Sequence, residues 1–349
     1  MKKSLFSCLT ELFTPVPPLP KVDLGGKTIL VIGANTGIGF ECAKYLASMK
    51  PSRLILGCRD QTRGEGAIRR LKAETGCGDV KGEVGVGIEM WLVDLADFES
   101  VKAFVGRAER ELERLDVLVL NAGVAQHTEL KYEQTKDGFE HALQVNNIAQ
   151  SLIGMRLIPL MNETAEAFGV KPRVVVVGSE VHYWGHIPDE ALYGSNVWRT
   201  LGSREYCSSF SVLFRRYLDT KLLNMFFVRA LQNRLKSQSI IVTCVNPGLC
   251  HSELRRTVRG IAAGILAIYE RVFARKTEDG GRLVAWVCIG EEEEESLKGA
   301  YVNLNRVEEP SDFVLGEEGK RREDKLWDDL VDMLVDIDER MKDVALTFV

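Results

Sequence analysis

The sequence of 349 residues has few of the features that indicate a metal site, a disulfide framework or a surface for nucleic acid. Its five histidines contain no His-Glu-x-x-His pattern, and His182 and His186 fall in a segment that reads as a loop, so no metal is expected. The eight cysteines contain no Cys-x-x-Cys pair, which favours buried free thiols in a reducing compartment. A formal net charge of −5 argues against nucleic acid as the main partner.

Long apolar runs are also missing. No uninterrupted run reaches the length of about eighteen apolar residues that suggests a membrane-spanning helix. Residues 1–23 begin with two lysines, but their apolar run is short and prolines follow it, so we interpret them as a proline-rich lead-in and expect a cytoplasmic protein. The apolar face of 258–273 leaves open a peripheral membrane contact. We favour a substrate lid or a contact between subunits of a homo-oligomer for the wider segment 249–296.

Short apolar runs that alternate with helix-favouring segments make up most of the chain. Such alternation requires crossover connections, and it predicts an α/β fold with a single doubly wound parallel sheet and helices on both faces. We expect one domain over 24–349, an added edge strand within 299–304 and a docking helix within 322–341. The expected strands are 27–33, 53–58, 88–95, 115–123, 173–179 and 240–248, and the expected helices between them include 62–75, 98–112, 135–160 and 215–235.

The sequence GANTGIG, residues 33–39, follows the first expected strand and begins the first expected helix. Glycine lets the backbone turn tightly and approach a pyrophosphate group, while the start of a helix offers free amides and the positive end of its dipole. A strand, a glycine-rich turn and a helix in this order predict a phosphate site for a dinucleotide.

Tyr217 and Lys221 stand four residues apart in RRYLDTKLLNMFF, residues 215–227. This spacing is about one turn of helix, so the two side chains would share a face. A phenol has a pKa of about 10, and a nearby ammonium group lowers it by favouring the phenolate. The pair can therefore be a proton donor with its partner, or only a half-buried tyrosine beside a lysine, and the spacing alone does not decide.

Taken together, these motifs resemble the short-chain dehydrogenase/reductase family over about residues 24–340, with retinol-dehydrogenase-like members of the kind found in fungal secondary metabolism as the closest likeness. The Gly-x-x-x-Gly-x-Gly spacing is that of the family, and Tyr217 and Lys221 fall where the order of its motifs requires them. Ile32 and Leu120 depart from the family pattern, which would weaken hydrogen bonds around the turn. The further matching segments are VDL (93–95), LNAG (120–123), QVNNIAQ (144–150), VVVVGSEVH (174–182) and NPGLCHSEL (246–254).

The resemblance implies a Rossmann-like nucleotide-binding fold and an NAD(P)-dependent oxidoreductase that acts on CH–OH groups. It implies that Tyr217 donates the proton, Lys221 assists it and binds the nicotinamide ribose, and Ser179 orients the carbonyl. It also implies that Asn146 holds a water that links Lys221 to solvent, with Asn147 as the rival for that role. The residues that it implies for cofactor binding, besides Tyr217 and Lys221, are Gly33, Asn35, Thr36, Gly37, Ile38, Gly39, Arg59, Asp94, Leu95, Asn121, Ala122, Gly123, Pro247, Gly248 and Ser252.

The residues after the second expected strand, GCRDQ, favour NADP(H) over NAD(H). Cys58 stands where NAD-binding relatives have an acid that binds the ribose hydroxyls, and Arg59 follows it. A guanidinium group suits the extra phosphate of NADP(H). Asp60 either reaches the ribose or caps the next turn.

Thirty-seven residues separate Ser179 from Tyr217, and we interpret 180–214 as a substrate loop. Its seven aromatic residues suggest that it lines an apolar pocket for a bulky hydrophobic carbonyl or alcohol, such as a secondary metabolite, with Trp184 and Trp198 as the best candidates for contact. A structural flap or a subunit contact is the alternative. For the whole protein, the alternative is a dinucleotide-binding scaffold or redox sensor without turnover, which would not need the serine and tyrosine.

Overall fold

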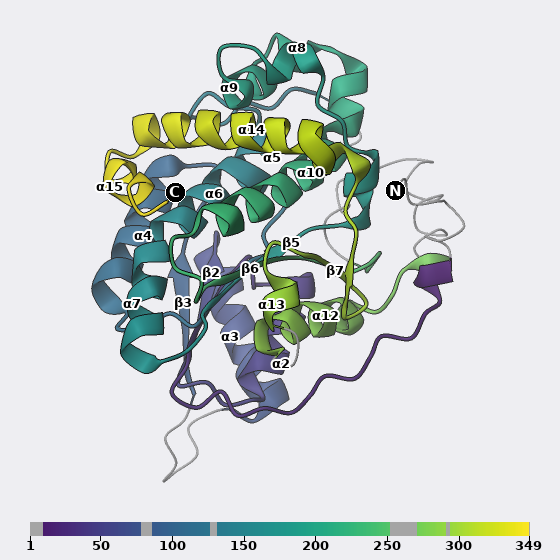
Figure 1. The fold of residues 1–349 in the computed structure, drawn as a ribbon. Helices are drawn as coiled ribbons and strands as arrows, with labels where there is room; N and C mark the ends of the chain where they lie inside the picture. The colour runs from purple at the N-terminus through teal and green to yellow at the C-terminus, as the bar shows by residue number, and fades with distance from the viewer. Residues whose placement is uncertain (1–9, 78–85, 126–130, 252–270, 291–293, 349) are drawn as a thin grey trace.

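The computed structural model describes residues 10–77, 86–125, 131–251, 271–290 and 294–348, which build an eight-stranded sheet between two layers of helices (Figure 1). The strand order is β3-β2-β1-β4-β5-β6-β7-β8, and every neighbouring pair is parallel except β7 and β8. The predicted doubly wound α/β fold is therefore confirmed. The strands are β1 (Thr28–Ile32), β2 (Arg53–Cys58), β3 (Gly87–Leu92), β4 (Val117–Leu120), β5 (Arg173–Val177), β6 (Ile241–Asn246), β7 (Tyr301–Asn303) and β8 (Arg306–Glu308).

The central strands are continuously apolar because both of their faces are covered. All side chains of β1 and β4 are buried, and the residues of β1 alternate between two separate hydrophobic clusters. Leu30 and Ile32 pack into the cluster on one face, and Ile29 and Val31 into the cluster on the other. This is the pattern expected of a parallel sheet with helices on both sides.

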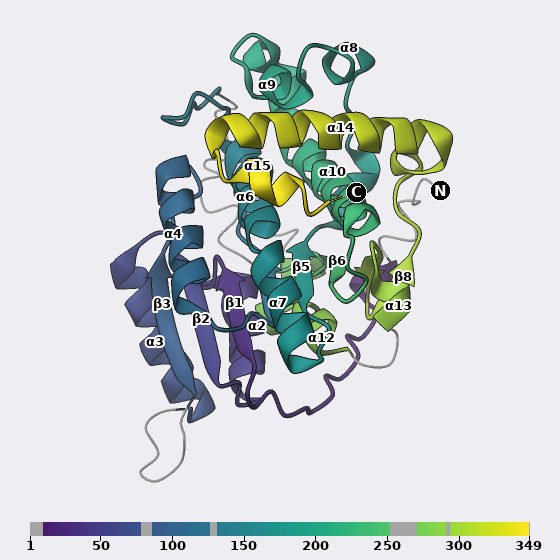
Figure 2. The same cartoon turned by 60° about the vertical axis from the view of Figure 1, so that its left-hand side comes forward.

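Each face of the sheet has its own set of helices (Figure 2). One face is covered by α2 (Gly37–Ala47), α3 (Gln61–Thr75), α12 (Thr277–Ile289) and α13 (Glu294–Leu297). The other is covered by α4 (Phe98–Glu111), α5 (His141–Leu143), the π-helical turn η1 (Gln144–Ile148), α6 (Ala149–Arg156), α7 (Ile158–Phe168) and α10 (Phe210–Arg234).

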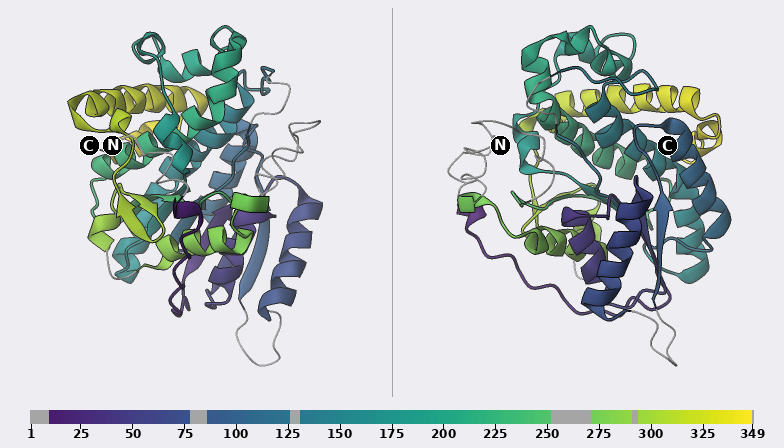
Figure 3. Two further views of the ribbon diagram at one scale, coloured as in Figure 1. Left: turned by 90° about the vertical axis from the view of Figure 1, so that its right-hand side faces the viewer. Right: turned by 180° about the vertical axis from the view of Figure 1, so that it is seen from behind.

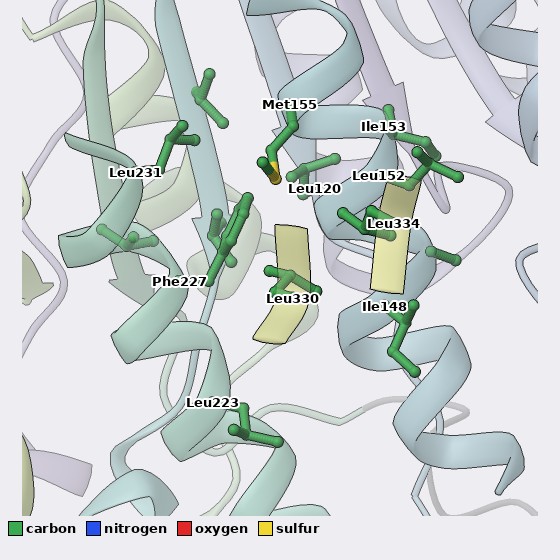
Figure 4. Packing of buried hydrophobic residues seen from close by; sticks show 14 of the residues in the cluster. Leu120, Ile148, Leu152, Ile153, Met155, Leu223, Phe227, Leu231, Leu330 and Leu334 are labelled. Carbon is green, nitrogen blue, oxygen red and sulfur yellow. The ribbon is translucent and has the colours of Figure 1, made fainter. Parts of the chain in front are cut away.

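A further layer covers α10 and α6. The long helix α14 (Gly316–Ile337) places Leu330 and Leu334 among side chains that include Phe227 of α10 and Leu152 of α6 (Figure 4). Its Trp327 is buried, as expected of a core aromatic. The short elements η5 (Asp312–Val314) and α15 (Met341–Ala345) flank α14 in the chain.

Four sequence-based expectations need correction. The helix expected over 135–160 is divided into α5, η1, α6 and the start of α7, and α10 begins at Phe210, five residues before the expected start at 215. The segment 299–304 does not supply the edge of the sheet, because β8 pairs with β7 on its outer side. The docking helix expected within 322–341 also begins earlier, at Gly316.

The segment 180–214 consists of short helices and not of an open loop. It contains η2 (Glu180–Trp184), α8 (Asp189–Leu192), α9 (Val197–Gly202) and η3 (Tyr206–Ser208). The helices α8 and α9 lie on the side of α14 that faces away from the sheet (Figures 1 and 3).

Trp198 is buried between α9 and α14, which corrects the expectation that it faces a substrate pocket. Its side chain is 2% exposed, and its indole N–H donates to the carbonyl of Leu326 at 2.9 Å. The neighbouring Val197 N–H donates to the carboxylate of Asp329 at 2.7 Å. Both contacts fix α9 to α14, because a buried indole needs an acceptor and an apolar surface together.

The lead-in is held against the protein at its described end. Arg275 donates to the carbonyl of Thr14 at 2.7 Å and also to the carbonyl of Glu11. Asn303 of β7 donates to the Glu11 carboxylate at 2.8 Å.

Two other kinds of site are absent from the described residues. None of the helices in these ranges is long and apolar enough to cross a membrane. No group of histidine, cysteine and acidic side chains in them could hold a metal ion. The seven cysteines in these ranges are free, and all except Cys77 are buried.

Candidate active site

The turn from β1 into α2 has a shape that only glycine permits at two positions. A Cβ atom at Gly33, where φ is +79°, would lie 2.8 Å from the Cα of Ala122. A Cβ atom at Gly39 would lie 2.4 Å from both the carbonyl oxygen of Gly33 and the side-chain nitrogen of Asn121. Gly37 has open space around it, but its φ of +62° also favours glycine. The backbone of this turn therefore packs directly against the end of β4.

The residues after β4 hold the glycine turn in place. The Asn121 side chain donates to the carbonyl of Gly33 at 2.9 Å. The carbonyl of the next residue, Ala122, accepts from Gln150 of α6 at 2.8 Å. Because α2 has no acidic residue in its first turn, the amides of its N-terminus face no carboxylate of their own turn. Such an end suits a phosphate group, and Asn35, Thr36 and Ile38 lie half-buried beside it.

At the end of β2 the structure separates the roles of three neighbouring residues. Asp60 caps α3, since its carboxylate accepts from the N–H of Arg63 at 2.8 Å. Burial raises the pKa of the Cys58 thiol to about 11, which leaves it neutral at physiological pH. Arg59 is exposed, and within the described ranges it forms no ion pair. The position where an acid would bind the ribose therefore holds a neutral thiol beside an available guanidinium group.

Asp94 and Leu95 follow β3, the strand next to β2. The Asp94 carboxylate accepts from the N–H of Ala96 at 3.0 Å, and the N–H of Asp94 donates to the hydroxyl of Ser100 at 2.9 Å. Leu95 is buried. These contacts fix the segment at the edge of the sheet where β2 also ends.

Tyr217 and Lys221 lie one turn apart on α10, as predicted. The ammonium nitrogen of Lys221 is 5.6 Å from the centre of the Tyr217 ring, and it donates to the carbonyl of Val177, the last residue of β5, at 2.7 Å. Burial lowers the pKa of Lys221 to about 8, although the nearby Cys244 opposes that shift. The lysine thus still carries its proton at neutral pH while it lies in a nearly dry environment.

The π-helical turn η1 places Asn146 close to Gly123 and Lys221. Single π-helical turns are rare and occur often at functional sites. The Asn146 amide exchanges two hydrogen bonds of 2.8 Å with the backbone of Val124 and donates to the Thr220 hydroxyl at 3.1 Å. A Cβ atom on Gly123 would lie 3.6 Å from the Asn146 oxygen and 3.9 Å from the Lys221 nitrogen. The absent side chain of Gly123 therefore leaves room between these two polar groups.

Asn147, the alternative to Asn146 as the partner of Lys221, points toward α10. Its amide donates to the backbone carbonyl of Thr220 at 2.8 Å and to the side chain of Asn224 at 2.6 Å. It therefore joins η1 to α10 inside the protein. This arrangement favours Asn146 as the polar partner of Lys221.

Ser179 follows β5 at the same edge of the sheet. Its hydroxyl accepts from the N–H of Val181 at 3.3 Å, and its carbonyl lies 2.8 Å from Nδ1 of His182. Because the N–H of Ser311 donates to Nε2 of His182 at 3.2 Å, the proton of the neutral imidazole lies on Nδ1 and points to Ser179. His182 thereby joins the Ser179 turn to the segment before η5.

The Pro-Gly loop begins directly after β6. The side-chain oxygen of Asn246 accepts from the N–H of Gly248 at 3.0 Å and from the N–H of Glu180 at 3.3 Å, so it joins this loop to the Ser179 turn. Pro247 is buried, and Gly248 has a φ of +77°. Ser252 lies outside the described residues, as do residues 252–270 and 291–293 of the segment 249–296.

The structure thus brings the glycine turn after β1 and Ser179 after β5 to the same edge of the sheet, with β4 between them, and Lys221 of α10 contacts the end of β5. Sequence reasoning missed four supporting residues within or beside the recognised motifs: Gln150, His182, Thr220 and Asn246. Three of them lie inside segments that the resemblance covers, so polar residues within those motifs could have indicated them. Thr220 could have been suspected from its place beside Lys221.

Fold and site together define a dinucleotide-binding oxidoreductase. The model of the family described as short chain dehydrogenase matches residues 27–195. A short chain dehydrogenase/reductase, dmxR8 of Cryptosporiopsis sp. (strain 8999), is 31% identical over 327 residues, which are 93% of this chain and 95% of the relative. The short chain dehydrogenase sol3 of Alternaria solani is 34% identical over 85% of this chain and 95% of its own length.

The chain therefore belongs to the short-chain dehydrogenase/reductase family, and it is an enzyme of that family. Solved structures agree on the fold. The RhlG/NADP active-site complex of Pseudomonas aeruginosa has a TM-score of 0.59 and 20% identity, with 81% of this chain and 96% of that chain covered.

Proposed function

We propose that this enzyme uses NADP(H) to interconvert a carbonyl and an alcohol on a bulky hydrophobic small molecule, such as a secondary metabolite. The observation that carries the proposal is the contact between Lys221 and the end of β5, because it joins the Tyr217 helix to the strand that leads into Ser179. The glycine turn follows β1, which is separated from β5 only by β4 in the same sheet. A group that donates a proton thus stands near a site that fits a dinucleotide.

The residues present fit a bound dinucleotide. A side chain at Gly33 or Gly39 would collide with the β4 end, and the missing side chain of Gly123 leaves room beside Lys221. The turn and the N-terminus of α2 would hold the pyrophosphate, while Lys221 would hold the nicotinamide ribose. When bound, NADPH supplies the hydride for reduction.

Residues of the chain itself donate the proton and replace it. Tyr217 donates its phenolic proton to the carbonyl oxygen, and the Ser179 hydroxyl orients that oxygen by a hydrogen bond. Lys221 stabilises the phenolate that remains, because an adjacent ammonium group favours the charged form. Asn146 holds the water through which the proton is replaced, and Gly123 leaves the space for it.

The preference for NADP(H) rests on the end of β2. Cys58 is a neutral thiol, Asp60 is engaged as a helix cap, and Arg59 is exposed and available for a phosphate. A neutral thiol thus stands where an acid would repel the extra phosphate, and the neighbouring guanidinium group suits that phosphate. The structurally similar protein of Pseudomonas aeruginosa was solved as a complex with NADP, which supports the same choice.

The test is oxidation of NADPH with a panel of ketones and aldehydes, followed by the Tyr217→Phe variant. Loss of a positioned proton donor should lower kcat by about 10²–10⁴-fold, while the affinity for NADPH stays the same. Tyr193→Phe is the matched control, because Tyr193 is exposed and lies outside α10.

Tyr217→Phe at most of the wild-type rate would contradict the mechanism. Tight NADPH binding without oxidation by any carbonyl would favour the scaffold or redox-sensor alternative.

A further inference from the structure

Two phenylalanines are exposed on the first turns of α10. Phe210 is 68% exposed and Phe214 is 66% exposed, and their rings stack with centroids 6.2 Å apart and planes 15° apart. Other phenylalanines of the same helix, Phe226 and Phe227, are buried. Two large apolar side chains that stack in solvent carry a free-energy cost, and such patches are often binding surfaces.

These phenylalanines share a helix face with the catalytic pair. The helix is continuous from Phe210 to Arg234, so Phe210, Phe214, Tyr217 and Lys221 fall at i, i+4, i+7 and i+11. At 3.6 residues per turn these positions stay within one narrow sector of the helix. Helical side chains lean toward the N-terminus, so the Tyr217 ring leans toward Phe214. The exposed rings therefore continue the surface that ends at the phenol.

Packed residues occupy both flanks of this sector. On one side Arg216 is fully buried, with its guanidinium 3.2 Å from the Glu140 carboxylate. On the other side η2 lies close to α10, since a Cβ atom on Gly185 would lie 2.8 Å from the carbonyl of Leu218. These contacts fix the rotation of α10 about its axis. The aromatic sector is thereby held in one orientation on α10, on the N-terminal side of Tyr217.

We infer that Phe210 and Phe214 bind the apolar body of the substrate while its carbonyl lies at Tyr217. We call this pair the aromatic strip. This inference rests on the proposed function and names its substrate class as extended, ring-bearing carbonyl compounds. Seven residues of helix rise by about 10 Å, so the strip matches a molecule with fused rings better than a short ketone. Stacked aromatic side chains bind flat rings through offset or edge contacts.

The test compares the reduction of two ketones by Phe210→Ala and Phe214→Ala enzymes. One ketone is a tetralone, which has fused rings, and the other is diacetyl, which is small and activated. In each variant the ratio of kcat/KM for the tetralone to that for diacetyl should fall by about tenfold, with most of the change in KM. Phe214→Leu, which keeps an apolar side chain without the ring, should lose less.

Tyr193→Ala is the matched control. Tyr193 is 53% exposed and belongs to the segment 180–214, as the two phenylalanines do, but it lies at the end of α8 and not on α10. The variant should keep the wild-type ratio. An unchanged ratio in both phenylalanine variants would overturn the inference. A change of oligomeric state in those variants relative to wild type would also overturn it, by showing that the strip is a subunit contact.

A binding measurement separates this inference from the proposed function. Saturation-transfer NMR with the tetralone and NADP+ reports contact without turnover. If wild-type enzyme reduces neither ketone, the proposed function fails, yet tetralone binding that Phe214→Ala abolishes would still support the strip. Tetralone binding that is equal in wild type and both alanine variants would overturn the strip, whatever the outcome for turnover.

Discussion

The glycine turn and the segment 180–214 are stabilised by different kinds of contact. At the glycine turn, backbone atoms meet backbone atoms, and a single Cβ at Gly39 would lie 2.4 Å from a carbonyl oxygen. In the segment 180–214, contacts join residues that are far apart in the sequence, as when the Trp198 indole of α9 donates to the Leu326 carbonyl of α14. The difference explains why the glycine turn can be recognised from a short motif and the packing of 180–214 cannot.

Two tryptophans in the segment 180–214 illustrate the point. Trp184 is 41% exposed at the end of η2, whereas Trp198 is 2% exposed between α9 and α14. Nothing in the local sequence distinguishes them, because the burial of Trp198 depends on a helix more than a hundred residues away in the chain. We therefore expect the largest losses of stability when a buried side chain is substituted, whether or not it lies in a recognised motif.

The largest expected effect on stability is that of Trp198→Ala. Removing a buried tryptophan and leaving a cavity should cost about 3–5 kcal/mol of unfolding free energy. Trp184→Ala should change it by no more than about 0.5 kcal/mol, as is usual for exposed positions. Urea unfolding of both variants measures the difference. Equal losses would mean that the two indoles are buried alike, against the structure.

Arg59→Ala should weaken NADPH binding by about 1.5–3 kcal/mol, the contribution of a hydrogen bond to a charged group. NADH binding should barely change, since NADH lacks the extra phosphate. Arg69→Ala on α3 is the control, because Arg69 is also exposed. Calorimetric titration with both cofactors measures the affinities. If NADPH and NADH lose affinity equally, Arg59 supports the fold or the shared pyrophosphate.

Gly39→Ala tests the close backbone contact of the glycine turn. Overpacking against Asn121 and Gly33 should cost about 1–3 kcal/mol of unfolding free energy and should also weaken NADPH binding. Gly66→Ala in α3 is the matched control, because a Cβ atom there would have only the Arg69 side chain nearby, at 3.9 Å.

The control should gain about 0.5–1 kcal/mol, the usual difference between alanine and glycine inside a helix. Thermal unfolding of both variants decides the comparison. If Gly66→Ala lowers the stability and Gly39→Ala does not, the close contact of the glycine turn is contradicted.

The smallest predicted effect concerns the pH dependence of stability. Burial lowers the pKa of Lys221 from its ordinary value of 10.5 to about 8. Between these values the unfolded chain binds more protons than the folded protein, so the free energy of unfolding rises with pH. Relative to Lys221→Met, the wild-type protein should gain about 1–2 kcal/mol from pH of about 8 to about 10. Parallel curves for the two proteins would show that Lys221 is not titrating in this range.

The sheet and the helix of Tyr217 and Lys221 could be predicted from sequence because their signals are local. Apolar runs such as RVVVV, residues 173–177, are buried on both faces, and the Tyr217–Lys221 spacing needs only a regular helix. The π-helical turn at Gln144–Ile148 could not be predicted, since it adds one residue to a helical turn that the apolar pattern does not reveal. The capping role of Asp60 could not be decided from sequence either, because it depends on where α3 begins.

The most direct test of the account is transfer of deuterium from NADPH labelled at its hydride-donating carbon to a ketone. We predict an alcohol with one deuterium on its carbinol carbon, and no such product from Tyr217→Phe enzyme that still binds NADPH. Unlabelled alcohol, or bound NADPH that transfers deuterium to no carbonyl compound, would contradict the assignment of this site as a carbonyl and alcohol oxidoreductase.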